Sequence, residues 1–235
     1  MKRALEMKLN QLKKISILEL VLSIPKTLYF NFKVLPIKRA IKIPFIVSHN
    51  IKLKGINRKT FIVENETLSF ASSRIGFEYT VGAFQESKKG IISIEEGKII
   101  LKGNVGLSQG IVLSANNSNI IIGKNFRCNY STQISSCDQD IIIGNNVVLG
   151  WKVTIKSDDG HYLIDNGKTK SKCAQVIIGE HVWLCSNSSL LKGSKIGNDC
   201  VVAYGSLITN KCFGNNTLIG GIPAHIIKEN IEWKE

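Results

Sequence analysis

The chain has 235 residues, of which 43% are hydrophobic and 21% are charged, and it contains only four prolines. This composition is typical of a globular protein and excludes a disordered chain. A membrane-spanning helix needs about 20 consecutive apolar residues. Charged residues interrupt the most hydrophobic stretch, residues 15–35, so we expect no such helix. The basic start is not followed by the uncharged core of a secretory signal, so we expect no secretory leader.

The net charge of +13 is concentrated in the first quarter of the sequence. Residues 1–60 hold fourteen Lys or Arg and two Glu, whereas the other 175 residues hold seventeen basic and sixteen acidic residues. We therefore predict two parts, a basic N-terminal segment, 1–60, and a nearly neutral domain, 61–235. The basic segment has no groove-reading motif, so we do not expect nucleic acid as a partner.

Residues 2–18 have the spacing of an amphipathic helix. Most of the cationic side chains lie off one stripe of this helix. The aliphatic residues share that stripe: Leu5, Leu9, Leu12 and Ile15. Three prolines up to residue 44 then predict irregular segments or short strands, and not another long helix. Two interpretations of the helix stay open. It packs on its own protein with its lysines in water, or it contacts an anionic membrane surface.

A repeat of six residues follows through most of the remaining chain. Small apolar residues recur in series, with Gly often next: Leu101, Leu107, Leu113; Ile122, Cys128, Ile134; Ile143, Leu149, Ile155; and Ile178, Leu184, Leu190, Ile196, Val202, Ile208. This period fits short strands that each point one side chain inward. Three strands then make a coil of eighteen residues, which stacks Ile178 on Ile196. The sequence therefore predicts a β-solenoid.

The turns between these strands contain Asn and Asp, which tolerate a left-handed backbone. They are Asn145, Asn146, Asn198 and Asp199. The general rule for parallel crossovers favours a right-handed coil, but the period itself does not decide the hand.

The longest interruption of the repeat is the polar stretch 156–176, which we expect to protrude as a loop. It contains His161 with Asp158, Asp159 and Asp165 nearby. A histidine near neutral pKa is well suited to take a proton from an attacking hydroxyl. The alternative is a solvated loop histidine without a role.

The six cysteines form no C-x-x-C pair, and no histidine lies at zinc-ligand spacing from them. We expect free thiols in a reducing cytosol and no metal. The protein is therefore expected to be cytoplasmic.

Three motifs together resemble the hexapeptide-repeat acyltransferases. They are D-G-H-Y-L-I-D, then I-I-G-E-H-V-W-L-C-S-N-S-S-L-L-K-G-S-K-I-G, and then G-G-I-P-A-H-I-I-K, with the repeats before them. The resemblance covers roughly residues 95–233 and is strongest to polysaccharide and sugar O-acetyltransferases. It implies a left-handed β-helix, a homotrimer, acetyl-CoA as the donor, and active sites in clefts between subunits.

The resemblance also implies roles for individual residues. His161 matches the catalytic histidine of the family. The positions that match acceptor contacts are Asn129, Asp138 and Trp183. The positions that match coenzyme contacts are Trp183, Ser186, Ala203, Thr209, His225 and Lys228. The sequence departs from the family where W-I-G becomes Trp183-Leu184-Cys185, and His225 is a weaker phosphate partner than Arg.

From these features we expect an acetyl-CoA-dependent O-acetyltransferase that acts on a sugar or polysaccharide by direct attack. Contact of residues 1–60 with the membrane would bring it to lipid-linked glycans on the inner face. Two alternatives stay open. One is an acetyltransferase of the same fold acting on a small molecule, namely an antibiotic, serine or a nucleotide-sugar amine. The other is a non-catalytic β-solenoid subunit.

Overall fold

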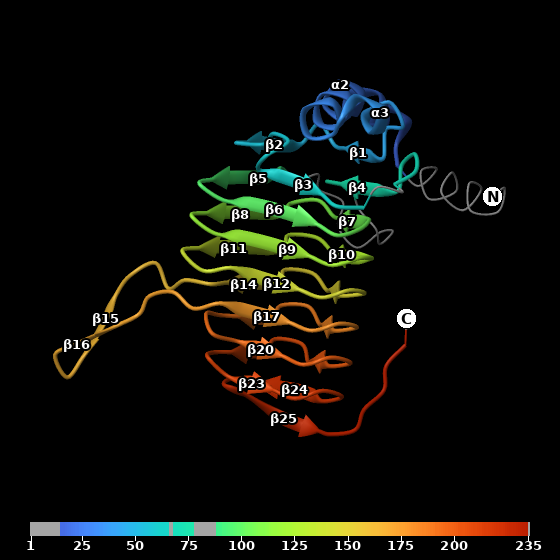
Figure 1. The fold of residues 1–235 in the computed structure, drawn as a ribbon. Coiled ribbons are helices and arrows are strands. Elements are labelled where there is room, and N and C mark those ends of the chain that lie inside the picture. The colour runs from blue at the N-terminus through green and yellow to red at the C-terminus, as the bar shows by residue number, and fades with distance from the viewer. Residues whose placement is uncertain (1–14, 66–67, 78–87, 235) are drawn as a thin grey trace.

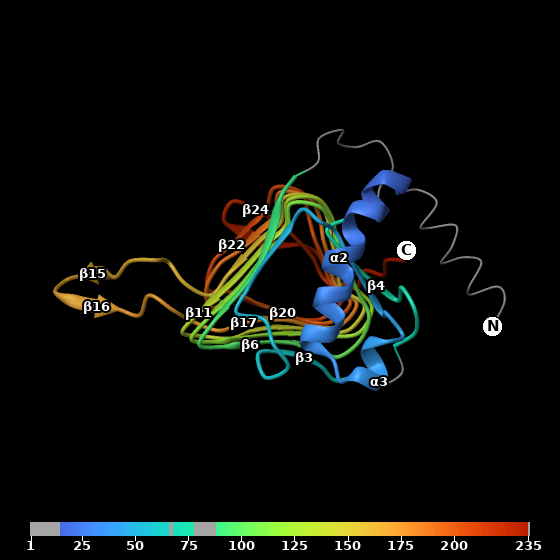
Figure 2. The same ribbon diagram turned by 90° about the horizontal axis from the view of Figure 1, so that it is seen from above.

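A computed structural model describes residues 15–65, 68–77 and 88–234. Three parallel sheets form the sides of a triangular prism, and the chain visits them in turn (Figures 1 and 2). Sheet A holds β1 Phe45–Val47, β4 Ser73–Ile75, β7 Val105–Leu107, β10 Phe126–Cys128, β13 Val148–Leu149, β18 Trp183–Leu184, β21 Val201–Val202, β24 Leu218–Gly221 and β25 Ala224–Lys228. Sheet B holds β2 Ile51–Lys54, β5 Gly90–Glu95, β8 Val112–Asn116, β11 Gln133–Cys137, β14 Thr154–Lys156, β19 Ser189–Leu190 and β22 Leu207–Ile208. Sheet C holds β3 Phe61–Val63, β6 Lys98–Leu101, β9 Asn119–Ile122, β12 Ile141–Ile143, β17 Val176–Ile178, β20 Lys195–Ile196 and β23 Cys212–Phe213.

The coil is left-handed. Seen from its N-terminal end, the chain runs counterclockwise from sheet C to sheet A to sheet B while it moves away from the viewer (Figures 1 and 2). The predicted fold class, a left-handed parallel β-helix, is therefore confirmed. The general crossover rule gave the wrong hand, because here the return path is two short strands of the same prism and not a helix packed on one sheet.

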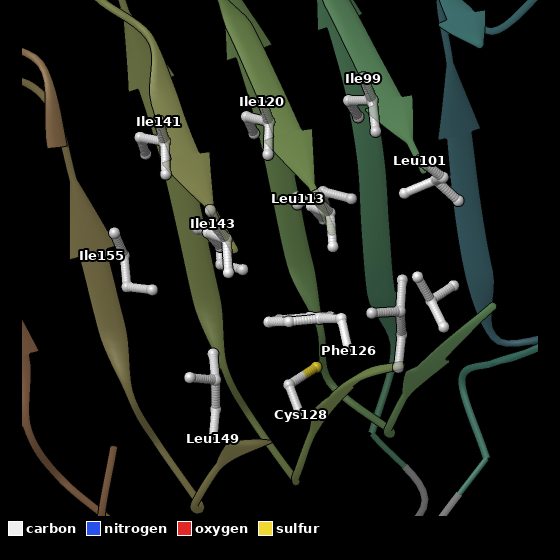
Figure 3. Close-up of a cluster of buried hydrophobic side chains, with 14 of the residues drawn as sticks. Ile99, Leu101, Leu113, Ile120, Phe126, Cys128, Ile141, Ile143, Leu149 and Ile155 are labelled. Atoms are coloured by element: carbon white, nitrogen blue, oxygen red, sulfur yellow. The ribbon is translucent and has the colours of Figure 1, made fainter. Parts of the chain in front are cut away.

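The stacking that the six-residue period predicted is also confirmed. Ile178 lies beside Ile196, Leu184 beside Val202, and Leu190 beside Ile208. From β5 to β14 the partners are 21 residues apart, as for Ile122 and Ile143, because each of those coils has three additional residues. The inward side chains form one continuous column, part of which is shown in Figure 3. Cys128 is a member of this column, and burial raises the pKa of its thiol to about 12.

The corners use Asn and Asp in two different ways. Asn146 and Asp199 have φ angles of 56° and 57°, as expected for the left-handed region. Asn145 and Asn198 do not adopt that conformation. Their side-chain oxygens instead accept hydrogen bonds from Lys124 N and Glu180 N in the neighbouring coil, each at 2.8 Å. The pairs Asn145-Asn146 and Asn198-Asp199 thus both turn the chain and tie successive coils together.

The N-terminal end differs from the prediction. Helix α2, Ile17–Val34, has Pro25 in its interior, and the short helix α3, Ile37–Ala40, follows. The expectation of no long helix after residue 18 was wrong, because contacts of α2 with β1 offset the lost hydrogen bond of Pro25, a cost of about 3 kcal/mol. Most of the amphipathic helix predicted over 2–18 lies outside the described residues. The β-helix itself begins at Phe45, ahead of the charge boundary at residue 60. Among the described residues, no helix is long and apolar enough to cross a membrane.

An arm leaves the prism between β14 and β17, where the sequence predicted a protruding loop (Figures 1 and 2). It is an antiparallel hairpin of β15, Leu163–Asp165, and β16, Lys168–Lys170.

Candidate active site

His161 lies on the arm, just before β15, and its side chain is exposed. The arm begins and ends at the corner between sheets B and C, where backbone hydrogen bonds close its base. Ala174 N donates to Ser157 O, and Asp159 N donates to Lys172 O, both at 2.9 Å. His161 is therefore exposed to solvent on an arm whose base is held by backbone hydrogen bonds.

Asp138 lies at this base, directly after β11. Its carboxylate accepts a hydrogen bond from Asn117 Nδ2 at 3.1 Å, and Lys172 Nζ lies 3.5 Å away. The hydrogen bond from Asn117 and the charge of Lys172 lower the pKa of Asp138. Lys172 in turn lies 5.4 Å from the centre of the Tyr162 ring, next to His161. Of the predicted acceptor residues, Asp138 is the one that the single chain brings to the base of the arm.

The following coil braces the same base from the other side. Lys192 Nζ lies 2.7 Å from Asp159 Oδ2 and donates a hydrogen bond to Ser171 O. Asp159 thus anchors the arm. Thr209, a predicted coenzyme contact, lies two coils further on at the same corner and is exposed.

Three other predicted residues lie at a different corner, between sheets A and B. Asn129 donates from Nδ2 to Leu149 O at 3.1 Å, and the hydroxyl of Ser186 accepts a hydrogen bond from Trp151 N at 3.0 Å. Of the three residues, Asn129 and Ser186 join successive coils through these hydrogen bonds, and Ala203 follows Val202, the strand partner of Leu184, one coil later. Within one chain, all of sheet B separates them from His161, so the fold does not bring the two groups together.

The remaining predicted residues lie on sheet A and its C-terminal extension. Trp183 begins β18, and 40% of its surface is exposed. His225 and Lys228 are exposed on β25, which pairs antiparallel with β24 at the end of the β-helix.

A cluster that the sequence did not predict surrounds Trp183 at the corner between sheets C and A. The Trp233 ring lies 6.0 Å from the Trp183 ring and stacks on His181 at 4.1 Å, with 8° between the planes. His181 Nδ1 lies 2.8 Å from Asp199 Oδ1. The sequence signal that could have found this pair is the spacing of eighteen residues between His181 and Asp199, which equals one coil.

In the part of the chain that the structure describes, no three His, Cys, Asp or Glu side chains gather in a way that could hold a metal ion. The cysteines at 128, 137, 173, 185, 200 and 212 are all free thiols.

Residues 175–210, the coils that directly follow the arm, match the family described as bacterial transferase hexapeptide (six repeats). The coils within residues 175–210 therefore carry that repeat. A 54-residue stretch, 23% of the chain, is 44% identical to the putative lipopolysaccharide biosynthesis O-acetyl transferase WbbJ of Escherichia coli (strain K12). The stretch spans 27% of the length of that relative. The resemblance to hexapeptide-repeat acetyltransferases is thus confirmed for part of the chain.

Solved structures also align with the chain. The polySia-specific acetyltransferase NeuO aligns over 81% of this chain and 82% of its own, with 20% identity and a TM-score of 0.49. A galactoside acetyltransferase in complex with coenzyme A aligns over 47% of this chain and 55% of its own, with 30% identity and a TM-score of 0.38. Both TM-scores lie below 0.5, so neither alignment supports a statement about substrate.

Proposed function

We propose that this protein is an O-acetyltransferase that moves acetyl from acetyl-CoA to a hydroxyl of a sugar or polysaccharide. The observation that carries the proposal is the position of His161. It lies on the long arm that leads directly into the coils carrying the transferase repeat. The partial identity with an O-acetyl transferase of lipopolysaccharide biosynthesis supports a glycan acceptor.

In the proposed reaction, a ring nitrogen of His161 takes the proton of the acceptor hydroxyl as its oxygen attacks the thioester carbonyl carbon of acetyl-CoA. The carbon–sulfur bond then breaks, and the CoA thiolate leaves and takes up the proton. A thioester is already activated, so the step needs no acyl-enzyme. General base catalysis contributes about 10²–10⁴ in rate, and positioning of both substrates contributes much of the rest.

The proposal includes a homotrimer with its sites between subunits. Asn129, Ser186 and Ala203 lie at another corner of the prism than His161, so the two groups can line one cleft only if they come from different copies. The arm supports this, because the side chains of Tyr162, Leu163 and Ile164 on it are more than half exposed in the single chain. A neighbouring copy would cover them.

The test is acetyl transfer from acetyl-CoA to a panel of glycans by the full chain and by His161→Ala. We expect kcat to fall by about 10²–10⁴, while CoA binding measured by calorimetry is retained. Lys168→Ala, on the same arm, serves as the matched control and keeps its activity. Near-normal turnover of His161→Ala would remove the histidine from the mechanism.

The same assay separates the alternatives. Transfer to chloramphenicol, serine or a nucleotide-sugar amine, with none to glycans, would assign a small-molecule acceptor. A chain that does not bind CoA would be a non-catalytic β-solenoid subunit.

A further inference from the structure

Helix α2 lies over the N-terminal end of the β-helix, alongside β1 (Figures 1 and 2). Phe30 of α2 packs edge-on against Phe45 of β1. Beside this contact, hydrogen bonds between α2 and residues 45–49 follow a regular pattern. Asn31 pairs with both backbone groups of Phe45, Thr27 with both of Val47, and Ser23 accepts from His49 N. Successive helical turns thus meet alternate residues of the strand. The repeat lengths agree, because four helical residues rise about 6 Å and two strand residues about 6.6 Å.

This pairing fixes which side of α2 faces outward. A helix normally turns its apolar stripe toward the protein. Here the open edge of β1 requires hydrogen-bond partners, so a polar stripe faces inward together with Phe30 and Val34. The apolar side chains on the opposite side of α2, and those of α3 beside it, are left exposed: Ile17, Leu18, Val21, Leu22, Ile24, Leu28, Tyr29, Phe32, Ile37 and Ile41. We call these ten residues the end face.

The end face lies within the basic part of the chain. Lys33, Lys38 and Lys42 are exposed at its border. Between residues 15 and 60, Glu19 is the one acidic residue against nine basic ones. Apolar side chains bordered by lysines match an anionic lipid surface, where the apolar groups enter the acyl boundary and each lysine near the surface adds about 1 kcal/mol.

We propose that the end face rests on the anionic surface of a lipid bilayer. The contact is peripheral, because α2 is 18 residues long, contains Pro25 and Lys26, and is hydrogen-bonded along its length to residues 45–51. A second copy of this protein is a poorer partner for the end face than a bilayer, because contact between two end faces would bring their cationic borders together. The proposal agrees with the expectation of a cytoplasmic protein at the inner membrane face, and it does not depend on the chemistry of the active site.

The experiment is flotation of the purified full chain with vesicles of phosphatidylcholine, with and without phosphatidylglycerol. The variant Leu18→Gln/Val21→Gln/Leu22→Gln removes three exposed apolar side chains of the end face without changing charge and without lowering helix propensity. The matched control is Ile222→Gln/Ile227→Gln, which removes exposed apolar side chains at the opposite end of the β-helix. Light scattering reports the oligomeric state of all three proteins.

We expect the wild type and the control to float with phosphatidylglycerol vesicles, with weaker binding to neutral ones and at high salt. The triple variant should bind at least about tenfold more weakly. The proposal is overturned if the wild type does not float, or if the triple variant floats as well as the control. It is also overturned if the substitutions alter the oligomeric state and the wild type does not bind vesicles. The end face would then be an interface between copies.

Discussion

The imidazole of His181 stacks on the indole of Trp233, although 52 residues separate them in the chain. Trp233 Nε1 also donates a hydrogen bond to His181 O at 2.9 Å. The carboxylate of Asp199 contacts the same imidazole at its ring nitrogen Nδ1. The C-terminal tail is thereby fixed alongside the coil that carries Trp183.

Replacing Trp233 with Ala should release this tail. A stacked aromatic pair contributes about 0.5–1.5 kcal/mol, and a hydrogen bond about 0.5–1.5 kcal/mol. Carboxypeptidase should therefore remove the residues after Glu229 at least about tenfold faster. Trp233→Phe keeps the stacking and loses the hydrogen bond, so its digestion rate should fall between the two. Equal rates for all three proteins would show that the stacking does not hold the tail.

Replacing Asp138 with Asn should loosen the base of the arm at neutral pH. The substitution removes the negative charge that Lys172 faces at 3.5 Å and that Asn117 stabilises. We expect faster proteolytic cleavage within residues 157–175. Asp165→Asn is the matched control, since its ion pair with Lys170 lies out on the hairpin and should not affect the base.

The hydrogen bond from Asn117 to Asp138, together with the charge of Lys172, also predicts a pH dependence. The pKa of Asp138 is lower in the folded protein than its ordinary value of 3.8, so the unfolded state binds a proton first as the pH falls. Protection of the arm should therefore be constant from neutral pH down to about 5 and decline below 3.8, as the pH falls through the lowered folded pKa. Asp138→Asn should lack this decline, and a parallel decline in the variant would assign it to another group.

The features predictable from the sequence were those repeated along the chain. The pairing of Ile178 with Ile196 follows from spacing alone, because each coil places its inward residue over the previous one. The stacking of His181 on Trp233 does not, since the tail has no repeat and its path depends on tertiary contacts. Helix α2 was missed because the rule against Pro25 in a helix considers local energy, whereas Asn31 and Thr27 bond to a strand formed later in the chain.

The arm supplies a test of the proposed trimer. Leu163→Asp/Ile164→Asp places two charges on side chains that are more than half exposed in the single chain. In a monomer this change is nearly neutral, whereas burial of unpaired charge at an interface is strongly destabilising. Light scattering should give three times 26.0 kDa for the wild type and a smaller mass for the variant. Lys168→Gln/Thr169→Gln, on the paired strand, is the control. A wild type that is monomeric at all concentrations would contradict the trimer.

The pairing of Asn31 with Phe45 should be a major source of stability at the N-terminal end. Asn31 Nδ2 donates to Phe45 O at 2.8 Å, and Asn31 Oδ1 accepts from Phe45 N at 3.2 Å, both in a buried setting. Asn31→Leu keeps the size of the side chain but leaves both backbone groups without partners. Each buried unpaired group costs about 1–3 kcal/mol, so the free energy of unfolding in urea should fall by about 2–6 kcal/mol. Tyr29→Ala, on the exposed side of the same helix, should change it by less than about 0.5 kcal/mol. Similar losses for the two variants would mean that α2 acts through its outward side chains and not through its bonds to β1.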